Sequence, residues 1–200
     1  ELNEEVKIYT KQLARSDFRA HVAPHTIELA SMFSVMSRLK LTEKCDPLTK
    51  MKIYNGDEVT EKGRAKKIDI KDLREESRHE GMTGISTRFI MKAIDNALSD
   101  SDRGMITPIS VRDSLIKQVK ESTLPDEERN RYLALLQKTV YDEYLKMLEK
   151  EIAKAFVSAF HEQAETLFQN YIDNVEAFVN RTMVKDSVTR EEINPDETFM

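Results

Sequence analysis

One arginine in the sequence has the chemistry and the position to contact a phosphate. Arg88 lies in the stretch Glu80 to Leu98, EGMTGISTRFIMKAIDNAL, where two glycines precede apolar residues at helical spacing. Ser86 can accept a hydrogen bond from the first free amides, so we expect a helix to begin at Ser86 or Thr87. Arg88 then lies in the first helical turn, where its planar, permanently charged guanidinium suits a phosphate. The alternative is an exposed arginine that pairs with an acidic neighbour.

The same helix should present one apolar face to the rest of the protein. Residues three and four apart share a face of an α-helix, so they are expected to pack together against other helices. Arg88 lies beside this face, close to where a cleft would open. The predicted members of the face are Ile85, Phe89, Ala93, Ile94 and Ala97, with Ile90 on the flank.

Other catalytic or metal-binding patterns are weak or absent in the sequence. It contains no GxxxxGK[ST] phosphate loop, no set of protein-kinase motifs and no GxSxG nucleophile motif. His21 and His25 are four residues apart, but Pro24 interrupts the helix that would align them on a metal. We therefore predict no catalytic residue and no metal site. His21 and His25 are interpreted as structural or capping residues, and His79 and His161 are equally unsupported as metal ligands.

The composition predicts a mainly α protein. The 200 residues are 40% hydrophobic and 34% charged, with 5 glycines, 5 prolines and no tryptophan, a balance that favours long helices. Cys45 is the single cysteine, which excludes an internal disulfide, and no apolar run has the roughly 18 residues of a membrane span. We expect a cytoplasmic protein.

The charge distribution argues against polyanion binding. The net charge is −5, and the segment from Asp126 to Met200 contributes −7 through 9 basic and 16 acidic residues. The first 125 residues therefore carry only +2, too little for a strong nucleic-acid surface. We expect neither nucleic-acid nor membrane binding. The chain lacks an initiator methionine and both ends are charged, so we expect an excised piece of a longer protein.

Apolar spacing predicts a small helical bundle over residues 1–122. After a first helix, a second is expected to enter at Pro24 and to bury more than half of its surface, as the centre of the bundle. A short helix over 69–76 leads to the stretch that contains Arg88. The first helix, expected over 3–15, should face inward through Leu2, Val6, Ile8, Tyr9 and Leu13.

Between these helices the helical pattern fails. The pairs Asp46-Pro47 and Asn55-Gly56 are turn signals, and the alternation between them predicts a short β-hairpin near 51–60 or an irregular loop. After residue 98 a linker over 99–108 precedes another helix, for which Ser110 and Asp113 resemble a capping box. The basic residues Lys62, Arg64, Lys66 and Lys67 are interpreted as a solvated loop, with contact to a nucleotide or a neighbouring subunit as the alternative.

A long helix, or a helical hairpin with an uncapped bend, is predicted after Pro125. No glycine or proline occurs between Asp126 and Asn194, and apolar residues recur at helical intervals. Such a stripe must pack on the first bundle, on further sequence or on another copy of the chain. The basic row of Lys146, Lys150 and Lys154 is interpreted as a solvated face, with partner docking as the alternative.

The segments EVKIYTKQLARSD, HVAPHTIELASMFSVMSRLK, MKIYNGD, EGMTGISTRFIMKAIDNAL and EIAKAFVSAFHEQAETLFQNYIDNVEAF resemble the bacterial PrkA family. ERNRYL and EEINPDE add to the resemblance, which spans nearly the whole chain in the family's order. These proteins are described as serine protein kinases with an AAA+ ATPase module followed by a helical PrkA C-terminal domain. The resemblance implies that residues 1–122 are the helical lid of the AAA+ module and that 123–200 begin the C-terminal domain.

The resemblance also implies a role for Arg88. GISTRF resembles the AAA+ sensor-2 motif GxSxR, whose arginine approaches the γ-phosphate of ATP bound on the preceding large domain. Thr87 departs from the proline that family members often have there, which leaves the helix start intact. The Walker residues that hold ATP and Mg²⁺ would lie upstream, in a longer parent protein (the parent).

Three functions follow from these observations. The leading hypothesis is a nucleotide-sensing and regulatory fragment of an ATP-dependent serine protein kinase in bacterial stress or starvation signalling. The second is part of an AAA+ remodelling or proteolysis-linked machine, and the third is a structural module for oligomerisation or adaptor binding. The expected partners are the upstream AAA+ core, a protein substrate and further copies of the chain. The fragment alone should neither catalyse nor bind ATP tightly.

Overall fold

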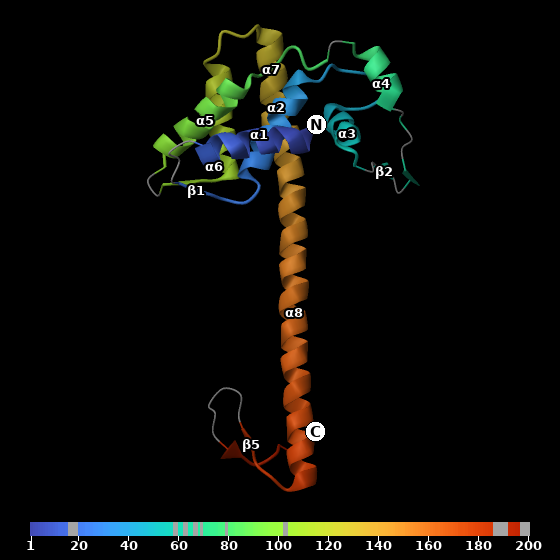
Figure 1. Ribbon diagram of the computed structural model, residues 1–200, viewed down its shortest axis with the longest axis vertical. Helices are drawn as coiled ribbons and strands as arrows, with labels where there is room; N and C mark the ends of the chain where they lie inside the picture. Colours follow the sequence, from blue (N-terminus) through green and yellow to red (C-terminus); the bar gives the residue numbers. More distant parts are fainter. Residues whose placement is uncertain are drawn as a thin grey trace. The chain divides into compact units, whose positions relative to one another are not determined.

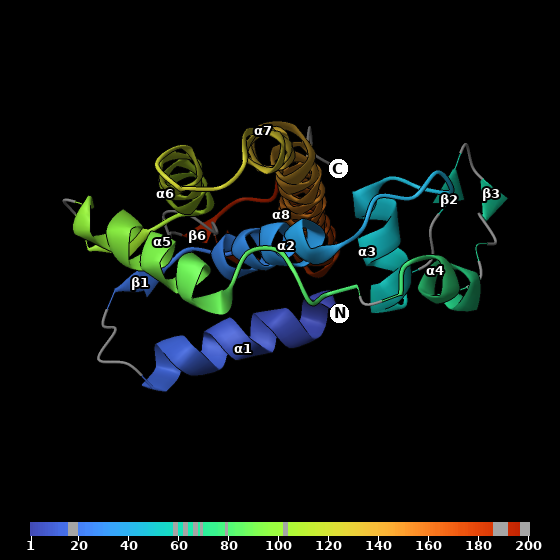
Figure 2. The same cartoon turned by 90° about the horizontal axis from the view of Figure 1, so that it is seen from above.

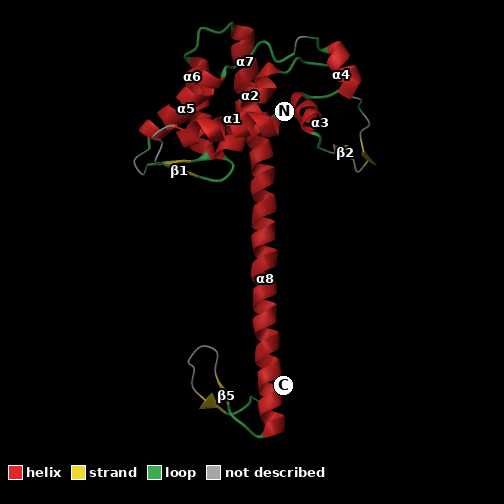
Figure 3. Cartoon of the chain, viewed as in Figure 1, coloured by secondary structure: helices red, strands yellow, loops and turns green. Residues whose placement is uncertain are grey.

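The computed structural model describes residues 1–15, 20–57, 60–61, 64–65, 68, 70–78, 80–101, 104–185 and 192–196. The chain divides into two compact units, Glu1–Leu145 and Lys146–Met200. The described residues are mainly helical, as predicted, and their strands form three two-stranded sheets (Figure 3). None of the described helices combines the length and the hydrophobicity that crossing a bilayer requires.

Helix α2 (Thr26–Arg38) is the centre of the first unit, as its wide apolar arc predicted. Figures 1 and 2 show α1 (Leu2–Arg15) on one side of α2, and α6 (Pro108–Lys120) and α7 (Asp126–Ala134) on the other. The helix entrance predicted at Pro24, His25 and Thr26 is confirmed, although Pro24 lies in the turn before the first helical residue, Thr26. Thr26 donates its backbone amide and its hydroxyl to the Ala23 carbonyl, and His25 caps the helix at φ +63°.

Helix α1 buries Tyr9 and Leu13 as predicted, but its inward face also contains a charge. Ile8 is 42% exposed, so the prediction that it faces the core was wrong. Glu5 lies one helical turn before Tyr9 and is only 6% exposed. A carboxylate thus occupies a core position that apolar spacing alone would not assign to it.

The predicted hairpin near 51–60 was wrong in position, because residues 51–54 are helical. Helix α3 (Pro47–Asn55) is capped by Asp46, whose side chain accepts hydrogen bonds from Leu48 and Thr49 amides, both at 3.0 Å. Gly56 ends the helix at φ +86°. The two turn signals are therefore a helix start and a helix stop. The antiparallel hairpin follows directly, as β2 (Thr60–Glu61) and β3 (Arg64–Ala65).

Helix α4 (Ile70–Glu76) confirms the short helix predicted there and packs on α3. A small core of its own joins the two helices. Its buried members are Cys45, Ile53 and Leu73, with the partly buried Tyr54 and Ile68 against them.

Helix α5 (Thr87–Ser99) begins where predicted, with Ser86 as the cap. Its face is turned slightly from the prediction: Ile90 is fully buried at the centre, whereas Phe89 is half-buried at the edge. Helix α6 is capped by Thr107 and not by Ser110, because Pro108 takes the first helical position and Ser110 is the reciprocal partner in the capping box.

The segment predicted as a plain linker contains a strand that sequence reasoning missed. Strand β4 (Met105–Ile106) pairs in parallel with β1 (His21–Val22), in the register His21 to Met105 and Val22 to Ile106. The pairing joins segments more than 80 residues apart. Two residues are too few for an alternating pattern to be recognised.

The helix after Pro125 runs continuously to residue 180. α7 passes through a π-helical stretch, η1 (Leu135–Thr139), into α8 (Val140–Asn180). The helix ends earlier than the Gly- and Pro-free run suggested, because Arg181 adopts φ +55°. Arg181 and Thr182 amides bond back to the Phe178 and Ala177 carbonyls, which is a Schellman ending made without glycine. In the second unit β5 (Val184–Lys185) then pairs antiparallel with β6 (Glu192–Ile193).

Candidate functional site

Arg88 lies in the first turn of α5, in the position that the sequence predicted. The Ser86 hydroxyl accepts the Phe89 amide hydrogen at 3.3 Å, which caps the helix two residues before the arginine. The Arg88 side chain is exposed and makes no hydrogen bond or ion pair with the described residues. The alternative of a paired surface arginine is therefore not what the structure shows.

Arg88 lines a hollow of about 380 Å³ between α5 and the end of α6. Lys92 lies one turn further along α5, also exposed, so two positive side chains share the hollow. Gln118 donates from Nε2 to the Phe89 carbonyl at 3.0 Å, while its buried Oε1 has no partner among the described residues. Glu121 is the acidic side chain of the hollow. A group with several anionic oxygens suits this arrangement.

The loop before α5 is bound to the last turn of α2. Gly81 donates its amide to the Arg38 carbonyl at 3.2 Å, and Ile85 donates its amide to the Ser37 hydroxyl at 3.0 Å. In return Arg38 Nε donates to the Ile85 carbonyl at 3.0 Å. Gly84 has φ +109°, and a Cβ there would lie 2.8 Å from the Ser37 carbonyl oxygen. Glycine is therefore required for this close approach.

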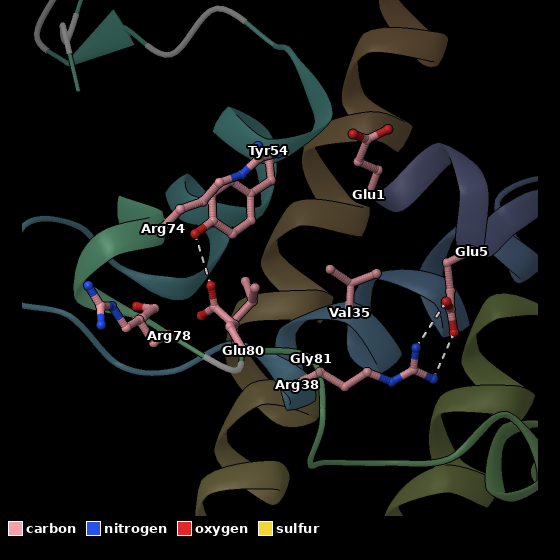
Figure 4. A pocket seen from close by; sticks show the side chains of 11 residues that line it. Glu1, Glu5, Val35, Arg38, Tyr54, Arg74, Arg78, Glu80 and Gly81 are labelled. Atoms are coloured by element: carbon pink, nitrogen blue, oxygen red, sulfur yellow. Dashed lines mark hydrogen bonds and ion pairs between the residues drawn. The ribbon is translucent and has the colours of Figure 1, made fainter. Parts of the chain in front are cut away.

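The Arg38 guanidinium is itself held by a buried network between α1 and α2. Its two terminal nitrogens lie 3.1 and 3.0 Å from the two carboxylate oxygens of Glu5 (Figure 4). Tyr9 donates its hydroxyl to Glu5 at 2.7 Å, and Ser34 donates to the same carboxylate at 2.8 Å. Burial would raise the pKa of Glu5, but hydrogen bonds from Tyr9 and Ser34 and the charge of Arg38 hold that pKa below its usual value.

A second buried ion pair fixes the same loop from the other side. Lys50 of α3 is fully buried, and its ammonium donates to Glu80 at 2.6 Å and to the Ser77 hydroxyl at 2.7 Å. Tyr54 donates its hydroxyl to the other carboxylate oxygen of Glu80 at 2.9 Å, a bond visible in Figure 4. The Lys40 backbone amide also donates to the Glu80 carboxylate, at 2.6 Å.

These two networks border a cavity of about 550 Å³ in the first unit (Figure 4). The carboxylates of Glu5 and Glu80 already accept several hydrogen bonds each, so neither is a free base. Arg74 and Arg78 of its wall are exposed. Its full lining is Glu1, Glu5, Val35, Arg38, Leu39, Tyr54, Arg74, Ser77, Arg78, Glu80 and Gly81.

Comparison with protein families then identifies the chain. The model of the PrkA serine protein kinase C-terminal domain matches residues 48–200, and the model of the PrkA AAA domain matches residues 1–46. The chain belongs to the PrkA family. Arg88 thus falls within the match to the C-terminal domain model, and the predicted domain boundary at residue 122 stays a prediction.

Curated proteins support the PrkA assignment. The ATP-dependent protease PrkA of Bacillus subtilis is 36% identical over 203 residues, which cover 100% of this chain and 32% of that protein. The serine/threonine kinase YeaG of Escherichia coli K12 is 29% identical over 98% of this chain and 31% of its own length. The PrkA-family chain therefore spans about a third of the length of these relatives. No solved structure matches it significantly.

The remaining predicted residues of this PrkA-family chain do not converge on a site. His21 lies in β1, while His25 caps α2 and contacts Glu28 through Nδ1. His161 is exposed on α8 beside Glu165. The described residues contain no group of three or more His, Cys, Asp or Glu side chains that could hold a metal.

Other predictions concern surface positions. Lys146, Lys150 and Lys154 are exposed on the part of α8 that belongs to the second unit. In the basic loop Arg64 lies in β3. His79, Lys62, Lys66 and Lys67 lie outside the described residues.

Sequence reasoning missed three charged residues that position the site, Glu5, Arg38 and Lys50. A weak signal exists for two of them. Glu5 falls four residues before Tyr9 on the apolar face of α1, and Lys50 falls beside Met51 and Ile53 in a helix that the turn signals concealed. Charged residues at core-facing positions are rarely buried unless paired, so each predicts a buried partner that the sequence does not name.

Proposed function

We propose that this PrkA-family chain is the nucleotide-sensing and regulatory part of an ATP-dependent bacterial serine protein kinase. The observation that carries the proposal is Arg88, which is exposed and unpaired among the described residues in the first turn of a capped helix. In the parent Arg88 would contact the γ-phosphate of ATP held by the AAA core. The match of residues 1–46 to the PrkA AAA domain supports nucleotide binding in the parent.

The chemistry of phosphoryl transfer explains why a single arginine matters. Charge builds up on the transferred phosphoryl group, and an arginine that reaches it stabilises the transition state. An arginine on a lid adds this stabilisation only when the lid closes on bound nucleotide, which links turnover to the position of the lid. Mg²⁺ would be held with ATP by the core and not by this chain. We include a cytoplasmic setting and a role in stress or starvation signalling in the proposal, as the family resemblance implies.

The test is ATP turnover by the parent with Arg88→Ala. We expect kcat to fall on the order of 100-fold, as on removal of one donor to a developing charge. Arg15→Ala is the matched control, because Arg15 is also an exposed helical arginine, at the C-terminal end of α1. Unchanged turnover in Arg88→Ala would reject the sensor role.

A second candidate output is ATP-dependent proteolysis. It is favoured by the name of the Bacillus subtilis relative, an ATP-dependent protease. The two outputs differ in product, so the parent is incubated with casein and γ-labelled ATP. Label on serine supports the kinase, and new peptide termini without label support the protease. In either case Arg88 would act on the ATP step.

A further inference from the structure

We infer that Arg38 is a positioning residue for Arg88, because it fixes the start of α5 on α2 and α1. This inference rests on the proposed function of Arg88. Arg38 lies at the end of α2 and does not line the hollow that contains Arg88. Its effect on that arginine is transmitted through the loop 81–86, whose last residue is the helix cap.

The loop is fixed at both of its ends by one turn of α2. At the start Gly81 bonds to the Arg38 carbonyl at 3.2 Å. At the end both backbone polar groups of Ile85 are engaged, the amide by Ser37 and the carbonyl by Arg38 Nε, each at 3.0 Å. Ile85 is only 4% exposed, so water does not readily replace these partners. The direction in which the chain enters the helix cap is therefore set by Arg38 and Ser37.

Arg38 cannot turn away from Ile85 without breaking its contacts with α1. The same guanidinium plane holds the Glu5 carboxylate through its two terminal nitrogens, at 3.1 and 3.0 Å. The Glu5 side chain is 7% exposed, so breaking the pair would leave a buried charge uncompensated. The fork geometry of arginine satisfies Ile85 and Glu5 together, whereas the single ammonium of lysine cannot.

The close approach at Gly84 makes the loop rigid in a second way. A Cβ there would lie 2.8 Å from the Ser37 carbonyl oxygen and 2.9 Å from Arg38 Cγ. The Gly84 backbone thus lies too close to Ser37 and the Arg38 stem for even a methyl group to fit between them. Any outward shift of the loop would carry Ser86 and the first turn of α5 with it.

A displacement of the loop 81–86 would affect catalysis and not only the structure. Transition-state contacts must be held to within about 0.5 Å, and a 1 Å displacement can reduce the rate on the order of 100-fold. A lid whose Arg88 is displaced would still bind ATP through the core. It would lose the contact that is made only as charge develops.

The experiment measures ATP turnover by the parent with Arg38→Lys, Arg88→Ala and the double variant. Arg38→Lys keeps a positive charge near Glu5 but loses the bond to Ile85. We expect kcat to fall about 10-fold or more, the KM for ATP to stay within about 2-fold, and the double variant to be no slower than Arg88→Ala. Arg112→Lys is the matched control, because Arg112 pairs with Asp113 at a similar side-chain exposure, 20% against 24%, away from the loop.

A second pair of variants covers the case in which Arg38→Lys does not fold. Gly84→Ala places a methyl group against Ser37 and should reproduce the loss in kcat. Gly56→Ala is its control, since Gly56 also has positive φ but has nothing within 4 Å of an added Cβ. Thermal unfolding of each variant confirms that it is folded at the assay temperature.

The outcomes separate the inference from the proposed function. Normal kcat in Arg38→Lys or, where that variant does not fold, in Gly84→Ala would overturn the positioning role. The positioning role would also be overturned if the fold-losses in kcat of Arg38→Lys and Arg88→Ala multiplied in the double variant. Two effects that act independently, such as a general destabilisation and the loss of Arg88, add in free energy. If Arg88→Ala itself turns over normally, the proposed function fails first.

Discussion

Charged residues in the core of the first unit are paired, and each pair joins segments far apart in the chain. Lys50 reaches Glu80 across 30 residues, and Arg38 reaches Glu5 across 33. Replacing a buried ion pair by apolar residues is often neutral, whereas removing one partner is costly. Such pairs specify which surfaces meet more than they add stability. In this protein Arg38 of one pair bonds to the loop 81–86 that leads to Arg88, and Glu80 of the other pair directly precedes that loop.

The Lys50 ion pair provides a stability prediction. We expect Lys50→Met to lower the free energy of unfolding of residues 1–200 by about 3 kcal/mol, because Glu80 loses its buried cation. The measurement is urea denaturation followed by circular dichroism. Lys44→Met is the control, since Lys44 pairs with Glu76 at 3.3 Å on the surface and should cost less than about 1 kcal/mol. Equal losses for the two variants would contradict the prediction.

Glu5 provides a prediction about pH. Its pKa is lowered from the ordinary 4.5, so the folded protein binds the proton more weakly than the unfolded chain. The stabilisation is therefore present above about pH 4.5 and is lost as pH falls through the lower folded pKa. We expect the difference in unfolding free energy between wild type and Glu5→Gln to be constant from pH 7 to 5 and to shrink below pH 4.5. A difference that grows in acid would mean the opposite shift.

At the scale of elements, the part of α8 that belongs to the second unit carries exposed apolar side chains. Phe156 and Phe160 are 76% and 72% exposed, and Phe168 is 65% exposed. Between residues 146 and 160 three lysines outnumber two glutamates, whereas residues 161–180 contain four acidic residues and no lysine or arginine. An antiparallel second copy would cover the aromatic side chains and place the basic half of each helix against the acidic half of the other. We propose such a second copy as the partner of α8.

This proposal predicts self-association. Residues 1–200 should form a dimer at micromolar concentration in light scattering after gel filtration, and Phe156→Glu with Phe160→Glu should yield a monomer. Added salt should weaken the dimer through its charged part. Met82→Glu is the control, since Met82 is an exposed apolar residue of the first unit, at 82%. A wild-type chain that stays monomeric near 100 µM would rule the dimer out.

At the scale of the whole molecule, the proposed function makes the candidate site one half of a nucleotide site. Arg88 and Lys92 offer two cations, but the chain contains no phosphate loop and no described metal cluster. A long-lived complex with ATP needs the backbone amides, lysine and Mg²⁺ site of a core domain. The chain spans about a third of its relatives' length, which agrees with a nucleotide site shared between this chain and a core domain.

ATP binding by the isolated chain tests whether a core domain is needed to complete the nucleotide site. We expect residues 1–200 to bind Mg·ATP with a Kd weaker than about 1 mM, which corresponds to little more than 4 kcal/mol. The parent should bind far more tightly under the same conditions. Titration calorimetry of both proteins is the measurement. Micromolar binding to residues 1–200 would show that the chain holds a complete nucleotide site.

Local sequence was sufficient wherever one residue and its near neighbours decide the structure. The start of α5 follows from Ser86 and the apolar spacing after it, and the central position of α2 follows from its wide apolar arc. The turn signals around α3 were recognised but assigned to the wrong element, because Asp-Pro and Asn-Gly serve hairpins and helix ends alike. The resemblance to the PrkA family came from segments along the whole chain.

Tertiary structure alone decided which distant groups meet. The sequence by itself determined a mainly helical protein with an arginine in the first turn of a capped helix. It could not show that Glu5 and Arg38 form one buried network, that Gly84 touches Ser37, or that β1 pairs with β4. The reason is physical. Helix periodicity and caps depend on residues within about four positions, whereas the partner of a buried charge is chosen by the packing of helices that lie far apart in the chain.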